Sequence, residues 1–212
     1  MPFLKKTVTS QATLGFWEIT ETWMELLSAV RLSGNDELRL QQCKTGHRKA
    51  EFLAVRALLQ TLTGEPAEIH YLSDGRPFLK GIRKQISISH SRNLAAVILS
   101  DLPSGIDVED SERSVAKIVP RFLSDAEQQW TLSAPNPHLA QLFCWCAKEA
   151  VFKLVRDTGI EFSQDIAIPP FNFQKTGAAA ALFCKNTPPQ KIPLCYTMVQ
   201  NNMVVWCVEI NK

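Results

Sequence analysis

Two acidic residues, Asp107 and Glu109, stand two positions apart in the segment Ile106-Asp107-Val108-Glu109, which alternates apolar and acidic side chains. This alternation predicts a strand, in which neighbouring side chains point to opposite faces. Both carboxylates should therefore lie on one face, with Val108 in the core. Two like charges at this spacing repel unless a cation lies between them, and carboxylate oxygens suit Mg²⁺. The pair is compatible with a metal site, although a strand edge facing solvent has the same pattern.

A second polar group lies on a predicted helix that begins at Asn136-Pro137, an N-cap followed by a proline at the first helical position. Trp145, Glu149 and Lys153 are spaced four apart and share roughly one helix face. With Lys148 beside Glu149, a carboxylate and two amines surround aromatic packing, as expected for a metal ligand beside cations that bind phosphate. The alternative is an ordinary amphipathic helix, with a Glu–Lys pair that contributes roughly a few tenths of a kcal/mol.

The third group is the run Ser87-Ile88-Ser89-His90-Ser91, where a predicted strand leads into a short polar turn. A hydroxyl and an imidazole can both meet a ligand there. A serine hydrolase is not indicated, because the chain has no Gly-x-Ser-x-Gly elbow and no evident Asp to orient the histidine. On its own, His90 also fits a structural role in the turn.

Helical and strand patterns place these groups in two similar halves of the chain. In the first half, the apolar stripe of residues 44–62 predicts a long helix that ends at Gly64. In the second half, Ser124 and Glu127 form a capping-box pattern at a helix start, and the long helix that follows should end at 157–159.

Each half also ends on an apolar strand, 94–99 and 203–210. We therefore predict a duplicated α+β unit. The turn residues from Asp101 to Gly105 mark the boundary, which gives subdomains 1–102 and 103–212.

Length and composition limit the class of protein. The 212 residues carry a formal net charge of +2, with 45% hydrophobic and 21% charged residues. These values exclude collagen and a coiled coil, and they give no reason to expect nucleic acid as a partner. No apolar run reaches the ~20 residues that cross a bilayer. No apolar stretch follows the lysines near the N-terminus and the six cysteines show no zinc-type pairing, so we expect a cytoplasmic protein with reduced thiols.

Taken together, these segments resemble the 4′-phosphopantetheinyl transferase family, specifically its larger, monomeric, surfactin-synthetase-activating (Sfp) type. The resemblance extends from about Gly46 to Lys153, and the ordered set of motifs is more specific than any one of them. The motifs are His47-Arg48, Gly75-Arg76-Pro77, Ile88-Ser89-His90-Ser91, Gly105-Ile106-Asp107-Val108-Glu109, Arg121-Phe122-Leu123-Ser124, and Trp145-Cys146-Ala147-Lys148-Glu149-Ala150 with Lys153.

The resemblance implies an α+β pseudo-dimer of two similar subdomains with the active site in the cleft between them. It also implies the reaction, in which the phosphopantetheine arm of coenzyme A moves to a serine of an apo carrier protein and 3′,5′-ADP is released. A chain that holds both halves needs no second copy, so a monomer is expected.

By position, the resemblance assigns Mg²⁺, or alternatively Mn²⁺, to Asp107, Glu109 and Glu149. It assigns to Lys153 the neutralisation of phosphate charge as the leaving group departs. Glu149 would also be the general base for the serine hydroxyl, either directly or through a metal-bound water.

Four residues match family positions that contact coenzyme A: Arg48, Arg76, Ser89 and His90. His90 would donate to the 3′-phosphate, and the two arginines would lie near the nucleotide and its phosphates. Many family members have Lys at position 76, and Arg keeps the charge. Lys44 and Arg39 are candidates for further contacts with the 3′-phosphate.

The segment from Ser114 to Ser124 resembles the stretch that docks the acyl or peptidyl carrier protein. Lys117 and Arg121 would complement an acidic carrier of fatty-acid, polyketide or nonribosomal-peptide synthesis. Phe122 and Leu123 would supply an apolar contact or belong to the core.

Two other functions stay open from the residues. A Mg²⁺-dependent nucleotide phosphohydrolase could use the same acidic cluster without a protein acceptor. A non-catalytic module that binds coenzyme A or a carrier protein would not need Asp107, Glu109, Glu149 and Lys153, all of which are present.

Overall fold

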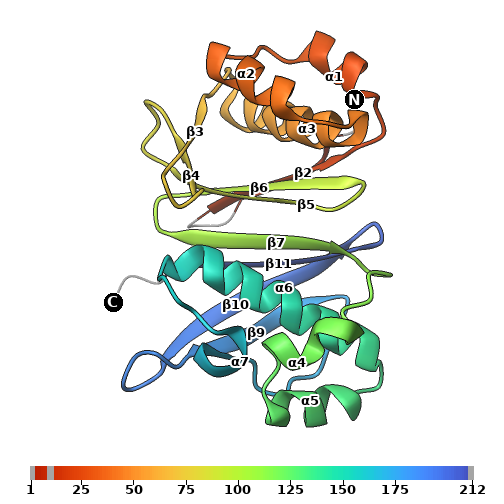
Figure 1. The fold of residues 1–212 in the computed structure, drawn as a ribbon, viewed down its shortest axis with the longest axis vertical. Helices are drawn as coiled ribbons and strands as arrows, with labels where there is room; N and C mark the ends of the chain where they lie inside the picture. The colour runs from red at the N-terminus through yellow and green to blue at the C-terminus, as the bar shows by residue number, and fades with distance from the viewer. Residues whose placement is uncertain (1–2, 9–11, 210–212) are drawn as a thin grey trace. The chain divides into compact units, whose positions relative to one another are not determined.

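The computed structural model describes residues 3–8 and 12–209 of the chain (Figure 1). The chain forms two compact units, Met1–Pro103 and Ser104–Lys212, and each has its own antiparallel sheet and its own helices. The α+β fold class is therefore confirmed. Among the described residues, no helix is both long enough and apolar enough to cross a membrane.

The first unit is built on a four-stranded sheet in the order β1-β2-β6-β5. Its strands are β1 (Phe3–Val8), β2 (Ala12–Glu18), β5 (Gln85–His90) and β6 (Leu94–Ser100). The last two form the hairpin that the alternating pattern predicted. Because β5 ends at His90, the imidazole lies at the turn of this hairpin, where the sequence placed it.

Three helices and a small hairpin complete the first unit: α1 (Trp23–Ala29), α2 (Gly34–Gln42), α3 (Gly46–Thr63), β3 (Ile69–Tyr71) and β4 (Pro77–Leu79). The helix α3 packs on β2 and β6. Gly15 of β2 permits this close packing, because a Cβ there would lie 2.8 Å from Cδ1 of Leu58. At its C-terminus α3 ends, as predicted, on Gly64, which has a φ of 81°.

The second unit is built on a five-stranded sheet in the order β7-β11-β10-β9-β8. Its strands are β7 (Ser104–Asp110), β8 (Ile166–Ala167), β9 (Thr176–Phe183), β10 (Gln190–Val199) and β11 (Asn202–Val208). Its helical segments are the 3₁₀ turn η1 (Ala116–Ile118), α4 (Val119–Phe122), α5 (Asp125–Leu132), α6 (Pro137–Val155) and α7 (Phe162–Asp165). The predicted capping box is present, because Ser124 and Glu127 exchange hydrogen bonds at the start of α5.

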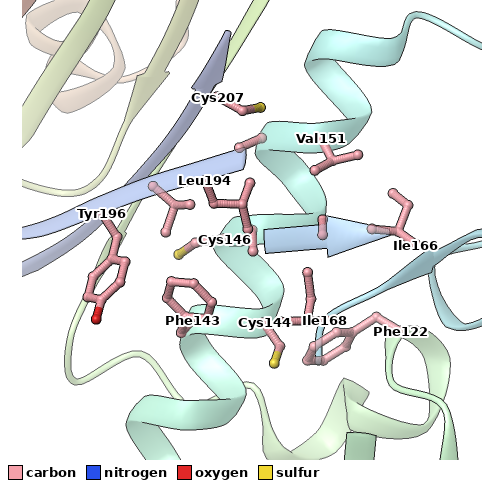
Figure 2. Close-up of a cluster of buried hydrophobic side chains, with 14 of the residues drawn as sticks. Phe122, Phe143, Cys144, Cys146, Val151, Ile166, Ile168, Leu194, Tyr196 and Cys207 are labelled. Atoms are coloured by element: carbon pink, nitrogen blue, oxygen red, sulfur yellow. The ribbon is translucent and has the colours of Figure 1, made fainter. Parts of the chain in front are cut away.

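The core of the second unit lies between α6 and the sheet (Figure 2). Phe143, Cys146 and Val151 of α6 belong to the same buried cluster as Leu194 and Tyr196 of β10. The rings of Phe143 and Tyr196 meet edge to face with their centroids 5.1 Å apart. This packing fixes the rotation of α6 about its axis, and it therefore decides which side chains of the helix face β7.

The two units share part of their order of elements. In each, the strand before the helices pairs with the last strand, β2 with β6 and β7 with β11. In each, the long helix packs against that strand pair, α3 in the first unit and α6 in the second. A glycine on the first strand, Gly15 or Gly105, allows the close approach in both.

One predicted boundary was wrong. The helix α6 ends at Val155, before the Asp157-Thr158-Gly159 stop that the sequence favoured. Arg156 takes up the left-handed conformation at the C-cap, with φ 58°, and its amide donates to the carbonyl of Phe152. Gly159 also has a positive φ, 67°, but it lies in the loop that follows.

Candidate active site

The two acidic residues of β7 face the helix α6. Gly105 lies on the same side of the strand, and a Cβ at Gly105 would be only 1.8 Å from the carbonyl oxygen of Ala150 in α6. Because side chains alternate along a strand, Asp107 and Glu109 point to this helix side as well. Val108, between them, is buried as predicted.

The helix α6 presents a complementary stripe to β7. Trp145 Nε1 donates to Oε1 of Glu109 at 2.8 Å. Two turns further along, Lys153 Nζ donates to Oδ1 of Asp107 at 2.8 Å. Glu149 lies one turn from each of these residues and so falls between them on the same stripe. The structure therefore brings together the four residues that the sequence assigned to metal binding and phosphate neutralisation.

Asp107, Glu109 and Glu149 are buried or half-buried, and they are close enough for their charges to interact. Burial raises the pKa of Glu149, and the negative charge of Asp107 raises it further. Burial also raises the pKa of Glu109, where the hydrogen bond from Arg113 opposes the shift and the charge of Asp107 adds to it. Glu109 and Glu149 are thus harder to ionise, first because they are buried and further because Asp107 is near, and a bound cation would relieve the repulsion.

Arg113 is a member of this cluster that sequence reasoning missed. It lies on the turn after β7, pairs with the Glu109 carboxylate and lies over the Trp145 ring, with its Cζ 5.6 Å from the centroid. The only sequence signal for it was the four-residue spacing from Glu109. On a continuous strand, residues four apart lie too far apart to form an ion pair. Arg113 can reach Glu109 only because β7 ends at Asp110 and the chain turns back after it.

The donor set suits a hard divalent cation, because all three candidate ligands offer carboxylate oxygens. Within the residues that the structure describes, no three His, Cys, Asp or Glu side chains are arranged so as to hold a metal ion. The side chains of Lys153 and Arg113 instead bind Asp107 and Glu109. The chemistry of the residues fits Mg²⁺, and these two cations occupy carboxylate oxygens that a metal would use.

Lys148 does not belong to the site, and the hypothesis of two amines beside Glu149 is wrong in this respect. Its Nζ is buried and donates to Oε2 of Glu127 at 2.8 Å and to the carbonyl of Phe162 at 2.8 Å. Burial lowers the pKa of Lys148. One residue along a helix is a rotation of about 100°, which is enough to turn Lys148 away from the stripe that carries Glu149.

In the first unit, Arg48 and His90 lie together. Nη1 of Arg48, in the first turn of α3, is 2.8 Å from Nε2 of His90 at the end of β5. Glu51, which sequence reasoning missed, lies behind both: its Oε2 accepts from Arg48 Nη1 at 2.7 Å, and its Oε1 is 3.5 Å from His90 Nδ1. The three-residue spacing of Arg48 and Glu51 on a helix was the available signal.

The other predicted contacts for coenzyme A are more dispersed within this unit. Ser89 precedes His90 on β5 and is buried, so its side chain points to the opposite face of the strand. Arg76 lies on the turn between β3 and β4 and pairs with Asp74. Arg39 lies over the ring of Tyr71, with its Cζ 3.9 Å from the centroid, and Lys44 is exposed.

The segment predicted to dock a carrier protein contains both exposed and buried side chains. Lys117 and Arg121 are exposed, as a docking role requires. Phe122 and Leu123 are buried in the core of the second unit, where the Phe122 ring meets the Trp145 ring edge to face with a centroid distance of 5.2 Å. Of the two alternatives for these apolar residues, the structure shows the core, so an apolar docking contact from them is excluded.

Comparison with known proteins finds a family similarity in the second half of the chain. Residues 103–200 match the family model described as the 4′-phosphopantetheinyl transferase superfamily. A search of curated proteins found no match. Among solved structures, the chain is similar to holo-[acyl-carrier-protein] synthase of Thermotoga maritima, at 19% sequence identity and a TM-score of 0.39. That match covers 52% of this chain and 65% of the other, which is less than two thirds of its length. The matched range 103–200 contains β7 and α6 with Asp107, Glu109, Glu149 and Lys153, and this part of the chain is similar to the 4′-phosphopantetheinyl transferase superfamily.

Proposed function

We propose that this protein transfers the 4′-phosphopantetheine arm of coenzyme A to a serine of an apo acyl or peptidyl carrier protein. One observation carries the proposal. The acidic face of β7 meets the Trp145–Glu149–Lys153 stripe of α6, within the unit that matches the superfamily.

In this proposal Asp107, Glu109 and Glu149 hold Mg²⁺, with Mn²⁺ as the alternative. When bound, the metal would supply positive charge at the pyrophosphate of coenzyme A. The pKa values of Glu109 and Glu149 are raised by burial and by neighbouring negative charge, which favours binding of a cation. Arg113 and Lys153 balance part of this charge in the free protein.

The transfer itself needs a base and a stabilised leaving group. The serine oxygen forms a bond to the β-phosphorus of coenzyme A, and the bond to the bridging oxygen breaks, which releases 3′,5′-ADP. Glu149 accepts the serine proton, directly or through a water molecule. Lys153, whose ammonium already lies against Asp107, neutralises negative charge on the leaving phosphate.

Residues of the first unit would bind the nucleotide end of coenzyme A. Arg48 and His90 support this role best, because their nitrogens lie 2.8 Å apart and can reach the same phosphate. Ser89 and Arg76 are proposed as further contacts, although Arg76 would have to leave Asp74 to reach a phosphate.

Recognition of the carrier protein would be electrostatic in the segment from Ser114 to Ser124. Lys117 and Arg121 are exposed and match the acidic surface that carriers present around the modified serine. Phe122 and Leu123 are buried and cannot contact the carrier. We therefore expect the exposed charges of this segment to govern the rate of association with the carrier. We further propose that the chain acts as a cytoplasmic monomer.

The proposal is tested by incubating the protein with coenzyme A, Mg²⁺ and a panel of apo carrier proteins from fatty-acid, polyketide and nonribosomal-peptide synthesis. Intact-mass spectrometry should show one added phosphopantetheine on at least one carrier, and none on the same carrier with its serine replaced by alanine. No mass shift across the panel would contradict the proposal.

A further inference from the structure

Glu51 is a buried carboxylate surrounded by basic side chains. It lies on the second turn of α3 and is 8% exposed. Oε1 is 3.2 Å from His47 Nε2 and 3.5 Å from His90 Nδ1, and Oε2 accepts from Arg48 Nη1 at 2.7 Å. Both carboxylate oxygens are therefore directed at groups that can themselves bind an anion.

The exposed fractions of these side chains differ: Glu51 is buried, whereas His47 and Arg48 are exposed and can reach a ligand. The side chains of His47 and Arg48 are 52% and 57% exposed, whereas that of Glu51 is 10% exposed. A carboxylate removed from water costs several kcal/mol unless it is paired, so the basic groups must stay close to Glu51. The buried acid thus holds the basic groups in place, while the side chains of His47 and Arg48 reach solvent and that of His90 is 27% exposed.

The same contacts define how the His90 ring is held. A guanidinium only donates hydrogen bonds, so Arg48 Nη1 at 2.8 Å requires Nε2 of His90 to accept. The ring proton is then assigned to Nδ1, which faces Oε1 of Glu51. A ligand phosphate that replaces this mutual contact would meet Nη1 of Arg48 and Nε2 of His90 together, with the carboxylate of Glu51 stabilising a protonated ring from the other side.

We propose that Glu51 is a positioning residue for the phosphate monoester of coenzyme A. It holds Arg48 and His90 as one pair, so that both address the same phosphate. This inference rests on the function proposed above for the choice of ligand, and it assigns to Glu51 no contact with the ligand itself.

The direct test uses two nucleotides that differ only in the 3′-phosphate, 3′,5′-ADP and 5′-AMP, with titration calorimetry on the full chain. The wild type should bind 3′,5′-ADP more tightly. Glu51→Gln should weaken binding of 3′,5′-ADP about 10-fold, the loss of one hydrogen bond between charged groups, and should change binding of 5′-AMP less than about 2-fold. The matched control is Glu37→Gln, the same chemical change at an exposed position of α2, which should leave both affinities unchanged.

Loss of folding cannot imitate this result, because the ratio of two affinities does not depend on the fraction of folded protein. Thermal unfolding reports whether Glu51→Gln folds. If it does not fold, Glu51→Asp is used instead, because this variant keeps the negative charge but shortens the side chain by one methylene group. The ratio of the affinities for 3′,5′-ADP and 5′-AMP is then compared with that of the wild type. Equal weakening of both nucleotides, or no change in either, would overturn the proposal.

Kinetics separate this inference from the proposed function. With a carrier that is modified, Glu51→Gln should raise KM for coenzyme A about 10-fold, and should leave kcat and KM for dephospho-coenzyme A within about 2-fold of the wild type. If transfer occurs but KM for coenzyme A is unchanged, the positioning role is wrong and the function stands. If no carrier is modified but preference for 3′,5′-ADP still depends on Glu51, the positioning role stands and the function is wrong.

Discussion

The ammonium of Lys153 lies 2.8 Å from Oδ1 of Asp107 and 2.9 Å from the carbonyl oxygen of Ile106. Asp107 of β7 and Lys153 of α6 are 46 residues apart in sequence, and their contact joins the strand to the helix beside Glu109 and Glu149. The relationship is informative because the two residues have opposite roles in the proposed reaction: one binds the metal and the other faces the departing phosphate. Each holds the other in place before either ligand arrives.

Removal of the Asp107 charge should stop transfer and spare the fold. In Asp107→Asn the side chain keeps its volume, and Lys153 keeps its hydrogen bond to Ile106. We expect kcat to fall by about 100-fold or more at every Mg²⁺ concentration. Asp110→Asn, on the same strand but the opposite face, is the matched control and should keep turnover. Near-normal turnover of Asp107→Asn at saturating Mg²⁺ would show that the metal assignment is wrong.

Lys153→Ala should lower turnover far more than it lowers stability. The Lys153 side chain is 28% exposed and the Asp107 side chain is 7% exposed, so loss of the ion pair should cost about 1–3 kcal/mol in the free energy of unfolding. The loss of charge at the leaving group should lower kcat by about 100-fold. Lys185→Ala removes a more exposed ion pair, with Asp157 at 3.3 Å, and should leave kcat unchanged. Denaturant unfolding and kcat are measured on both variants. If kcat of Lys153→Ala falls only as far as its loss of stability explains, the role of Lys153 is purely structural.

Gly105→Ala should be strongly destabilising. The new Cβ would lie 1.8 Å from the Ala150 carbonyl oxygen and 3.1 Å from the Leu154 amide nitrogen, so β7 and α6 must separate. Overpacking of this kind costs about 1–3 kcal/mol or more in the free energy of unfolding. At Gly34, the first residue of α2, a Cβ meets nothing within 4 Å, and Gly34→Ala should be neutral or slightly stabilising. Equal midpoints of urea unfolding for the two variants would contradict the packing described here.

Lys148→Met should destabilise the second unit because it leaves the buried carboxylate of Glu127 without its ion-pair partner. Glu127 accepts from Lys148 Nζ at 2.8 Å and from the Ile168 amide at 2.8 Å, and it is buried. Loss of one partner of a buried ion pair costs about 3–5 kcal/mol. The double variant Lys148→Met with Glu127→Gln removes the stranded charge and should recover much of the loss. A double variant that unfolds at the same urea concentration as Lys148→Met would show that the lysine acts through packing alone.

Local patterns predicted much of this architecture because they depend on neighbouring residues. The capping box of Ser124 and Glu127, the left-handed stop at Gly64 and the shared face of Asp107 and Glu109 all follow from short-range geometry. The α+β class followed from the alternation of helical and strand patterns. The end of α6 was missed because Arg156, with no sequence signal, took the left-handed position.

The parts that the sequence did not reveal depend on contacts between distant residues. Whether Lys148 or Lys153 faces β7 is decided by the packing of Phe143 and its neighbours against the sheet. Glu51 reads as an ordinary helical acid until β5 brings His90 against it. Arg113 joins the cluster only through the turn that follows β7.

Transfer from coenzyme A to a carrier serine yields two products that can be measured in one reaction. The rate of 3′,5′-ADP release and the mass of the carrier protein are followed together, with and without apo carrier. We expect one 3′,5′-ADP for each carrier that gains a phosphopantetheine, and no release when the carrier is omitted or its serine is replaced by alanine. Release of 3′,5′-ADP at the same rate without a carrier would rule out the proposed transfer and would identify a phosphohydrolase instead.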